Sequence, residues 1–344
     1  NKLKPHILKL PNVVLVDIAG PGFINITLKQ NTWSNCIKNI LLNPDNWYKQ
    51  DLGKGKRVNL EYVSANPTGP LHAGHARGAV FGDALASLLN EVGYQVVKEY
   101  YINDAGSQIE KLIESSLLRY DECNGKNIKE IPEGLYPGEY LKEVGKALLI
   151  KYGKNLKQNS NEDVFDLVRK VSLEVIMKMI KEDLYKLGIE MDVFTSEKNI
   201  ISGNLLTDIL TILEDKNLTY YGTLDPPKGT DPKKWKKRKQ FLFKSTKYGD
   251  DSDRVLKKSD GSWTYFATDM AYHLDKINRT NGDLINVLGA DHAGYISRIH
   301  AAVNAISNGS ISIDTKVCAL VNLMDKGKPI KMSKRAGNFV TLSD

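Results

Sequence analysis

Cysteine is scarce in this sequence, which has Cys36, Cys123 and Cys318 among 344 residues. The three lie far apart in the chain and match no zinc-ligand spacing. This excludes a disulfide-stabilised scaffold and a cysteine-based zinc site. We interpret these cysteines as reduced structural or surface thiols of a cytoplasmic protein.

Long apolar runs are also missing. No run approaches the roughly 20 residues that a membrane helix needs, and the most apolar early segment, Val13 to Ile18, is only long enough for a strand. The N-terminus lacks the apolar core of a secretory signal. The hydrophobic fraction of 41% and the charged fraction of 26% are typical of a folded protein with about two domains. A net charge of +7 is compatible with a polyanionic partner but is weak support for one by itself.

The most regular pattern lies between residues 57 and 102. Residues 57–64 alternate between apolar and polar as a strand does, residues 73–92 carry apolar side chains at helical spacing, and residues 95–102 form a second strand-like run. A strand, a glycine-rich loop, a helix and a strand make a βαβ unit, which implies a parallel sheet with a right-handed crossover. Ligands of such sheets bind at the carboxyl ends of the strands, so the first loop is the expected site.

The rest of the chain supports an α/β fold. Residues 12–29 predict two short strands around an Ala-Gly-Pro-Gly turn, and the stretch from 106 to 190 is mostly helical in pattern. The alternation then resumes, with a helix predicted at 264–275, a strand at 284–288, a helix at 296–306 and a strand at 316–323. We therefore expect a Rossmann-like parallel sheet with a largely helical insertion and a short N-terminal β remnant.

The first loop reads PLHAGH at residues 70–75. Gly74 lets a nucleotide approach the backbone closely, and the start of a helix favours anionic phosphates. The imidazoles of His72 and His75 can donate hydrogen bonds to phosphate oxygens as charge builds on them. Metal ligation is a rival role, although no third ligand has a suitable spacing nearby, and a structural pair of histidines is the plainer alternative.

A second motif, KMSK at residues 331–334, lies near the other end of the sequence. Lys331 and Lys334 can neutralise a pyrophosphate leaving group, and Ser333 adds a hydroxyl donor. A solvated basic loop is the alternative for this motif taken alone.

The two motifs together resemble the signature pair of the class I aminoacyl-tRNA synthetases, which bind ATP from opposite sides. GADH at residues 289–292 follows a predicted strand and is similar to the ribose-contacting segment of that family. The resemblance implies catalytic roles for His72, His75, Lys331 and Lys334. It implies ATP contacts for Pro70, Leu71, His72, Gly74, His75, Gly289, Asp291, His292, Lys331, Met332, Ser333 and Lys334.

The surroundings of the motifs narrow the resemblance to the bacterial type of arginyl-tRNA synthetase. EYVSANPTGPLHAGHARGAVFGDAL, YYINDAGSQIEKL, VLGADHAGYISRIHAA and KMSKRAGNFVTL carry it, and it extends over nearly all of 58–344. AGPGFINITL is similar to the end of the N-terminal tRNA-contacting domain of that family. We expect a catalytic core that lacks the C-terminal anticodon-binding domain and most of the N-terminal domain.

The departures from the family pattern are small. Ala73 replaces a bulkier residue in the first motif, and Arg335 stands where many class I enzymes have serine. Both motif lysines remain.

The resemblance also implies an arginine pocket, and carboxylates with flat polar partners suit a guanidinium. Asp269 and Glu61 would hold the guanidinium side and Tyr265 would shape the pocket. Ser64, Asn66 and His75 would lie near the α-amino and carboxylate end of arginine. His292 and Asp291 would contact arginine, ribose or both. The plainer alternatives are a sheet-packing role for Tyr265 and surface or capping roles for Glu61 and Asp269.

Two further groups remain open. Asn103, Asp104 and Gln108 could cap a helix or contact substrate. The cluster KKWKKRK at 233–239 could touch tRNA or form a solvated charged face.

The resemblance assigns the following ranges. Residues 1–30 are the tail of the N-terminal domain, 31–57 a linker and helix, 58–105 the first half of the catalytic domain, 106–200 the mostly helical insertion, 201–323 the second half with a small insertion near 222–250, and 324–344 the KMSK loop.

The expected function is arginine–tRNA ligation, in which ATP with Mg²⁺ activates arginine for transfer to tRNA(Arg). We expect no bound zinc and no membrane association, and a cytoplasmic monomer. Two alternatives stay open. One is a different nucleotidylyl transferase or class I synthetase with the same histidine loop, and the other is a non-catalytic tRNA-binding paralogue.

Overall fold

The computed structural model describes residues 2–46, 49–158, 160–225, 238–325, 327–330 and 340–342. The central feature is a sheet of five parallel strands in the order β10-β9-β3-β4-β5. This confirms the predicted Rossmann-like α/β fold. The strands are β3 (Arg57–Glu61), β4 (Gln95–Ile102), β5 (Val193–Ser196), β9 (Asp283–Gly289) and β10 (Ile313–Cys318).

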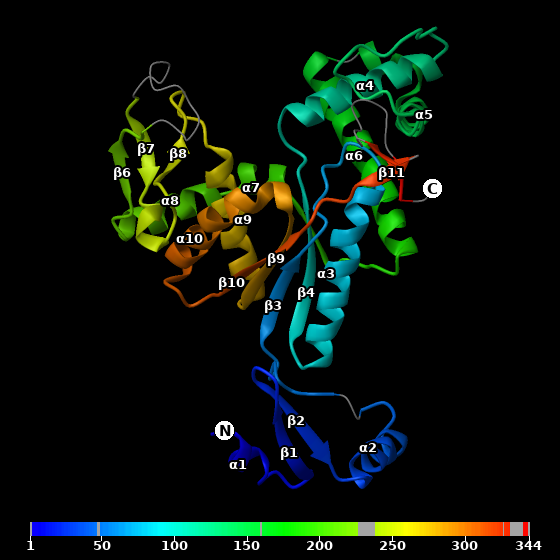
Figure 1. Cartoon of the computed structure of the whole chain (residues 1–344). Helices are drawn as coiled ribbons and strands as arrows, with labels where there is room; N and C mark the ends of the chain where they lie inside the picture. Colours follow the sequence, from blue (N-terminus) through cyan, green and yellow to red (C-terminus); the bar gives the residue numbers. More distant parts are fainter. Residues whose placement is uncertain are drawn as a thin grey trace.

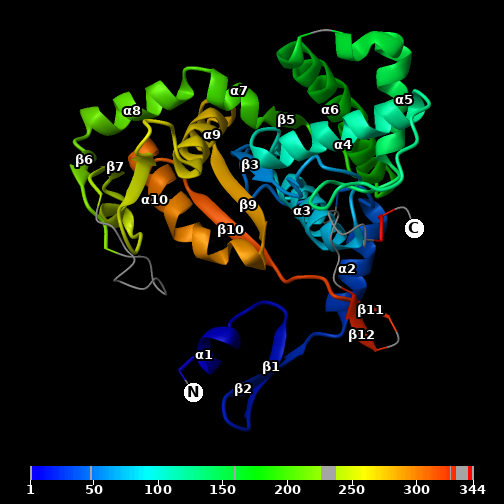
Figure 2. The ribbon, with the colours of Figure 1, turned by 90° about the horizontal axis from the view of Figure 1, so that it is seen from above.

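The strand order creates a switch point between β3 and β9. From β3 the chain proceeds through α3 (Ala73–Glu91) to β4 on one side, and later returns through α9 (Tyr265–Thr280) to β9 on the other side of β3. From β9 it passes through α10 (Ile296–Ser307) to β10. Right-handed crossovers that run in opposite directions place α3 and α10 on opposite faces of the sheet, as Figures 1 and 2 show. A crevice at the carboxyl ends of β3 and β9 is where such a sheet binds a ligand.

A helical insertion separates β4 from β5. It consists of α4 (Ser107–Cys123), α5 (Leu141–Tyr152), η1 (Gly153–Gln158) and α6 (Asn161–Lys186). Its apolar faces share one buried cluster with β3, β4 and the loop after β3. In Figure 1 the insertion lies at the carboxyl end of the sheet, opposite the N-terminal hairpin.

A second cluster lies on the other side of the sheet. It joins α8 and α9 to α10 and to a three-stranded antiparallel sheet. The elements not yet given are α7 (Glu197–Ser202), α8 (Leu205–Asp215), β6 (Thr219–Gly222), β7 (Gln240–Phe243), η2 (Ser245–Tyr248), β8 (Arg254–Lys257) and η3 (Ala290–Tyr295).

The ends of the chain form small separate elements. At the start these are α1 (Lys4–Ile7), β1 (Val13–Ala19), β2 (Phe23–Leu28) and α2 (Asn31–Leu42), and near the end β11 (Leu323–Asp325) pairs with β12 (Lys328–Ile330). The β1–β2 hairpin leaves large apolar side chains exposed, among them Phe23 at 71%. The predicted pair of strands around the Ala-Gly-Pro-Gly turn is confirmed.

Three parts of the structure differ from the sequence prediction. Residues 193–196, inside the range predicted as the helical insertion, form the edge strand of the parallel sheet. The last strand of the parallel sheet is β10 at Ile313–Cys318 rather than 316–323, and its register pairs Ile313 with Leu284 near the start of β9. The sheet β6–β7–β8 was not predicted, since each strand has only four residues. Most of the KKWKKRK cluster lies outside the described residues.

Candidate active site at the switch point of the sheet

The two histidines of the first motif form the start of α3. His72 is the N-cap residue, and its Nδ1 accepts a hydrogen bond from the backbone N–H of Gly74 at 3.1 Å. The backbone N–H of His72 donates to Nδ1 of His75 at 3.1 Å, and the two rings stack with centroids 3.8 Å apart. Because both Nδ1 atoms accept, the proton of each neutral ring lies on Nε2. Each ring therefore carries an Nε2–H donor at the N-terminus of a helix, where anions are favoured.

The segment that follows the second motif lies against the first. Leu342 donates its backbone N–H to the carbonyl of Leu71 at 2.9 Å, and the N–H of Ala73 donates to the carbonyl of Val340 at 3.2 Å. These bonds flank an antiparallel bridge between His72 and Thr341. Lys331, Met332, Ser333 and Lys334 lie outside the described residues. The chain a few residues after the lysines is thus hydrogen-bonded to the histidine loop, more than 250 residues away in sequence.

Glu61 ends β3 with its charge already compensated. Its Oε1 accepts from the hydroxyl of Ser64 at 2.8 Å, and its Oε2 accepts from the ammonium of Lys276, which is fully buried on α9. Lys276 also donates to Oδ1 of Asn286 on β9 at 2.9 Å. Glu61 is therefore a buried, paired carboxylate and not a surface residue.

The backbone after Glu61 is strained. Val63 and Ser64 have φ values of 69° and 40°, which are costly for residues with a Cβ and most of all for a β-branched one. The bend lets the Ser64 hydroxyl also accept from the N–H of Tyr101 at 3.1 Å. Strain of this kind is held where the surrounding structure requires it, and here it shapes the loop at the switch point.

Asn66 and the NDAGSQ segment meet on the other side of this loop. The amide of Asn66 donates to Oε1 of Gln108 at 3.0 Å, and Asn66 itself is exposed. Asp104 accepts from the hydroxyl of Ser196 at 2.7 Å and from the N–H of Lys198 at 2.9 Å, so it caps the start of α7. Of the two roles left open for Asp104, the structure shows the capping one.

Asp269 lies in the first turns of α9, which begins directly after the N-cap Thr264. Its Oδ2 accepts from the hydroxyl of Tyr295 at 2.6 Å. The pKa of Asp269 is raised to about 7, mainly by desolvation and also by the charges of Glu61 and Glu197, while the hydrogen bond from Tyr295 and the charge of Lys276 oppose the rise.

Glu197, at the start of α7, is a candidate site residue that the sequence did not reveal, and its charge acts on Asp269. It is 7% exposed, and burial together with the charge of Asp104 raises its pKa. Neither Glu197 nor Asp269 has a salt bridge to a basic residue in the part of the chain that the structure describes. The sequence signal for Glu197 would have been its position directly after a strand. That strand, β5, is too short to be identified from its hydrophobic pattern.

Tyr265 is the first residue of α9 and is 72% exposed, so it is not a sheet-packing aromatic. Its hydroxyl lies 3.6 Å from the position that a Cβ on Gly106 would take. This places Tyr265 beside the loop after β4, at the same edge of the sheet as Asp269.

GADH follows β9 as predicted. Gly289 ends the strand, and a Cβ there would lie 2.4 Å from Oδ1 of Asp291, so a larger residue would require the exposed Asp291 side chain to turn away. Asp291 and His292 are exposed, with 3.5 Å between Oδ2 of Asp291 and Nε2 of His292. These polar groups stand across the switch point from the histidine loop.

No group of three or more His, Cys, Asp or Glu side chains that could hold a metal ion occurs among the described residues. No described helix is both long and apolar enough to cross a membrane.

Comparison with known proteins agrees with this geometry. The profile of class I tRNA synthetases (R), catalytic domain, matches residues 36–344. The arginine–tRNA ligase of Parvibaculum lavamentivorans is 53% identical over 332 residues, which cover 96% of this chain and 57% of the relative. That of Rickettsia canadensis is 50% identical over 343 residues, which cover 100% of this chain and 59% of the relative. This chain therefore spans less than two thirds of these relatives.

Solved structures show the same fold. A Campylobacter jejuni protein provisionally assigned as an arginyl-tRNA synthetase superposes with a TM-score of 0.75 at 36% identity, covering 92% of this chain and 65% of that one. Thermus thermophilus arginyl-tRNA synthetase superposes with a TM-score of 0.64 at 18% identity, covering 92% and 56% of the two chains, and supports the fold alone.

Proposed function

Because the chain belongs to the arginyl family of class I tRNA synthetases, we propose that it carries the catalytic site of an arginine–tRNA ligase. The reaction has two steps. The carboxylate of arginine attacks the α-phosphorus of ATP, which gives arginyl-adenylate and pyrophosphate. The 2′-OH of the terminal adenosine of tRNA(Arg) then takes the arginyl group and releases AMP.

The observation that carries this proposal is the pair of carboxylates formed by Asp269, which is half-buried, and Glu197, which is buried. Desolvation raises the pKa of both carboxyls, and the charge of Glu197 raises that of Asp269 further. Neither has a salt bridge to a basic residue among the described residues, so the ionised form of one disfavours ionisation of the other. A guanidinium between them removes that repulsion, and its planar donors match carboxylate geometry better than an ammonium does. Tyr265 would cover this end of the pocket.

We place Glu61 at the other end of the arginine, although the resemblance alone put it on the guanidinium side. Lys276 already balances its charge, so Glu61 is less suited to neutralise a second cation. With Ser64 and Asn66 it shapes the strained loop where the α-amino and carboxylate groups would lie, close to His75.

The ATP phosphates would lie at the N-terminus of α3. The Nε2–H groups of His72 and His75 would donate hydrogen bonds to phosphate oxygens. Lys331 and Lys334 would neutralise the pyrophosphate from the opposite side. Little covalent work is left for side chains, so the site would act by positioning and by stabilising charge. Asp291 and His292 would contact ribose, arginine or both.

The partners follow from the reaction. Mg²⁺ would arrive with ATP as part of the substrate complex, and tRNA(Arg) would accept the product. We propose a cytoplasmic monomer.

The test is ATP–pyrophosphate exchange with a panel of amino acids in the presence of tRNA(Arg). We expect arginine to be the only amino acid of the panel that stimulates exchange. Stimulation by a different amino acid would show a different class I synthetase, and absence of exchange with retained tRNA binding would show a non-catalytic paralogue.

A further inference from the structure

The loop that leads into the first motif is fixed by side chains from outside it. Tyr100 on β4 donates to the carbonyl of Ala65 at 2.7 Å, and Tyr140 donates to the carbonyl of Thr68 at 2.6 Å. Asp183 on α6 accepts from the backbone N–H of Leu71 at 3.0 Å. Two of these three anchors, Tyr140 and Asp183, belong to the helical insertion and not to the Rossmann-like sheet.

The contact with Asp183 is the most specific of the three. Asp183 is 6% exposed and lies 112 residues after Leu71 in sequence. The N–H of Leu71 precedes the helix and is buried, so it needs an acceptor, and a carboxylate is a stronger acceptor than a carbonyl.

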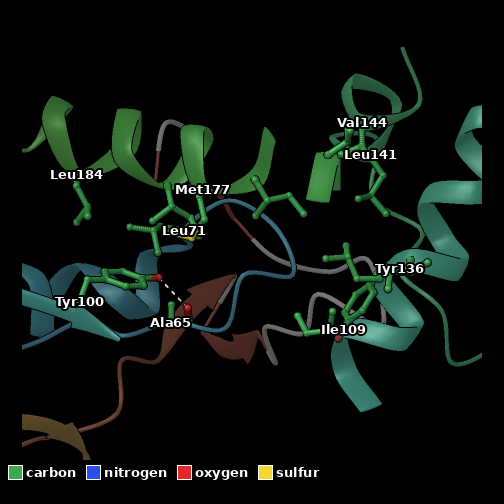
Figure 3. Packing of buried hydrophobic residues seen from close by; sticks show 14 of the residues in the cluster. Ala65, Leu71, Tyr100, Ile109, Tyr136, Leu141, Val144, Met177 and Leu184 are labelled. Atoms are coloured by element: carbon green, nitrogen blue, oxygen red, sulfur yellow. Dashed lines mark hydrogen bonds between the residues drawn. The ribbon is translucent and has the colours of Figure 1, made fainter. Parts of the chain in front are cut away.

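The same face of α6 also holds the Leu71 side chain. Leu71 is fully buried, and Figure 3 shows it beside Met177, with Leu184 further along the helix. The face of α6 that packs on Leu71 thus also supplies the acceptor for its backbone.

Tyr140 makes a second contact of the insertion with this loop. A Cβ on Gly69 would lie 2.6 Å from Cζ of Tyr140, so the ring packs directly on the glycine backbone. Together, Tyr140 and Asp183 leave the segment from Thr68 to Leu71 little freedom to shift.

Leu71 is also the junction between the two motifs. Its N–H reaches the insertion through Asp183, and its carbonyl accepts from Leu342, just after the lysine motif. The next residue is His72, the N-cap of α3. A shift of Leu71 therefore moves the first imidazole and the bridge to the second motif together.

We propose that Asp183 is a positioning residue for the nucleotide loop, so that the helical insertion sets how well the site binds ATP. Asp183 acts through the Leu71 backbone and holds His72 and His75 where their Nε2–H groups meet the phosphates. This inference rests on the proposed function only in requiring that this loop bind ATP.

The experiment compares Asp183→Leu, Asp183→Asn and Tyr140→Phe with wild type. The dissociation constants of ATP and of arginine are each measured by calorimetry, and thermal unfolding is recorded for every variant. Glu182→Leu is the matched control, because Glu182 is the neighbouring residue on α6 and is exposed.

We expect Asp183→Leu to weaken ATP binding about tenfold or more while the dissociation constant of arginine changes less than about twofold. Asp183→Asn keeps an acceptor oxygen and should recover most of the affinity, and Tyr140→Phe should lose about threefold. Glu182→Leu should match wild type. If Asp183→Leu does not fold, the expected threefold loss in Tyr140→Phe decides in its place.

ATP affinity equal to wild type in the folded variants, with only a lower unfolding temperature, would overturn the inference and leave Asp183 a structural residue. Equal losses for ATP and arginine would overturn it too. A wild-type protein that binds ATP but activates a different amino acid contradicts the proposed function and leaves this inference intact. Failure of wild type to bind ATP removes both.

Discussion

Asp269 and Glu197 are the residues in which burial and charge conflict most clearly. Buried carboxylates are normally paired with cations, as Glu61 is with Lys276. Asp269 and Glu197 have no salt bridge of this kind among the described residues. Their raised pKa values record the resulting instability of the charged forms. We expect a cationic ligand to bind here, because its positive charge would stabilise the ionised form of both carboxylates.

The raised pKa of Asp269 predicts a pH dependence of arginine binding. Its carboxyl must be ionised to hold a guanidinium, and its pKa is about 7 without ligand. Below that pH the group is protonated, so we expect the dissociation constant of arginine to rise by up to about tenfold per pH unit as pH falls from 7 to 5. Calorimetric titration with arginine at pH 5, 6, 7 and 8 measures it.

Asp269→Asn is the control, since it should bind arginine weakly and with a flatter profile. Equal wild-type affinities at pH 6 and pH 8 would contradict the assignment of Asp269 to the guanidinium.

We expect Lys334 to act in the chemical step and not in amino-acid binding. We expect Lys334→Ala to abolish detectable pyrophosphate exchange, a loss of at least about 10²-fold, because the leaving pyrophosphate loses a charged partner. The dissociation constant of arginine should stay within about twofold of wild type. Lys178→Ala, at an exposed position of α6, is the control. Exchange at the wild-type rate in Lys334→Ala would remove the proposed role of the second motif.

At the scale of the element, α3 shows why a helix that bears a site contains glycine. A Cβ on Gly82 would lie 2.2 Å from Cγ of Tyr62, so this glycine lets the helix approach the strand end closely. Gly78, one turn earlier, would meet nothing within 4 Å. The two positions share one helix and differ only in what they face.

We expect Gly82→Ala to lower the free energy of unfolding by about 1–3 kcal/mol, because Tyr62 or the helix must shift. Gly78→Ala should be neutral or raise it by up to about 1 kcal/mol through helix propensity. Chemical denaturation of both variants gives the comparison, and a stable Gly82→Ala protein would mean that this packing is looser than described.

Lys276 joins three elements through one buried ammonium. It comes from α9 and contacts Glu61 on β3 and Asn286 on β9, with the Tyr272 ring 4.5 Å away. Asn286 in turn donates to Nε2 of His273, whose pKa burial lowers to about 3, so that ring stays neutral. The helix carrying Asp269 is thereby tied to the strand carrying Glu61.

We expect Lys276→Met to lower the free energy of unfolding by about 3–5 kcal/mol, since it leaves the Glu61 charge buried without its partner. Adding Glu61→Gln to that variant should recover part of the loss, as urea denaturation of wild type, the two single variants and the double variant would show. Additive losses in this double-mutant cycle would mean that the two residues are not coupled.

At the scale of the whole molecule, stability is distributed unevenly. The central strands β3 and β9 have neighbours on both edges and helices on both faces, whereas β1 and β2 form an isolated two-stranded hairpin. Two-stranded hairpins are marginal by themselves. The candidate site therefore lies at the ends of strands that are paired on both edges.

Hydrogen exchange should reveal this difference. We expect the amides of residues 57–61 to exchange at least about 10²-fold more slowly than those of residues 23–28. Mass spectrometry of peptides from these two segments, taken from the same native sample, provides the measurement. Comparable protection would show that the hairpin unfolds only with the sheet.

Local pattern predicted the main elements because they are long and regular. Apolar spacing placed α3 and β4, the turn chemistry placed the β1–β2 hairpin, and the histidine and lysine motifs indicated nucleotide chemistry. Strands of four residues carry too little periodicity to be recognised, which is why β5 and the small antiparallel sheet were missed. Glu197 was missed together with β5, because it directly follows that strand. A carboxylate has no local sequence signature of a site unless the end of the strand before it is known.

By itself the sequence determined the class of fold, the two motifs and the family, because each depends on residues adjacent in the chain or repeated at a fixed spacing. Only the tertiary structure decided which charges are balanced and which are not. Lys276 pairs with Glu61 across 215 residues and Asp183 meets Leu71 across 112. Such partners are set by how helices pack on a sheet, and that packing brings together groups whose separation along the chain says nothing about their distance in space.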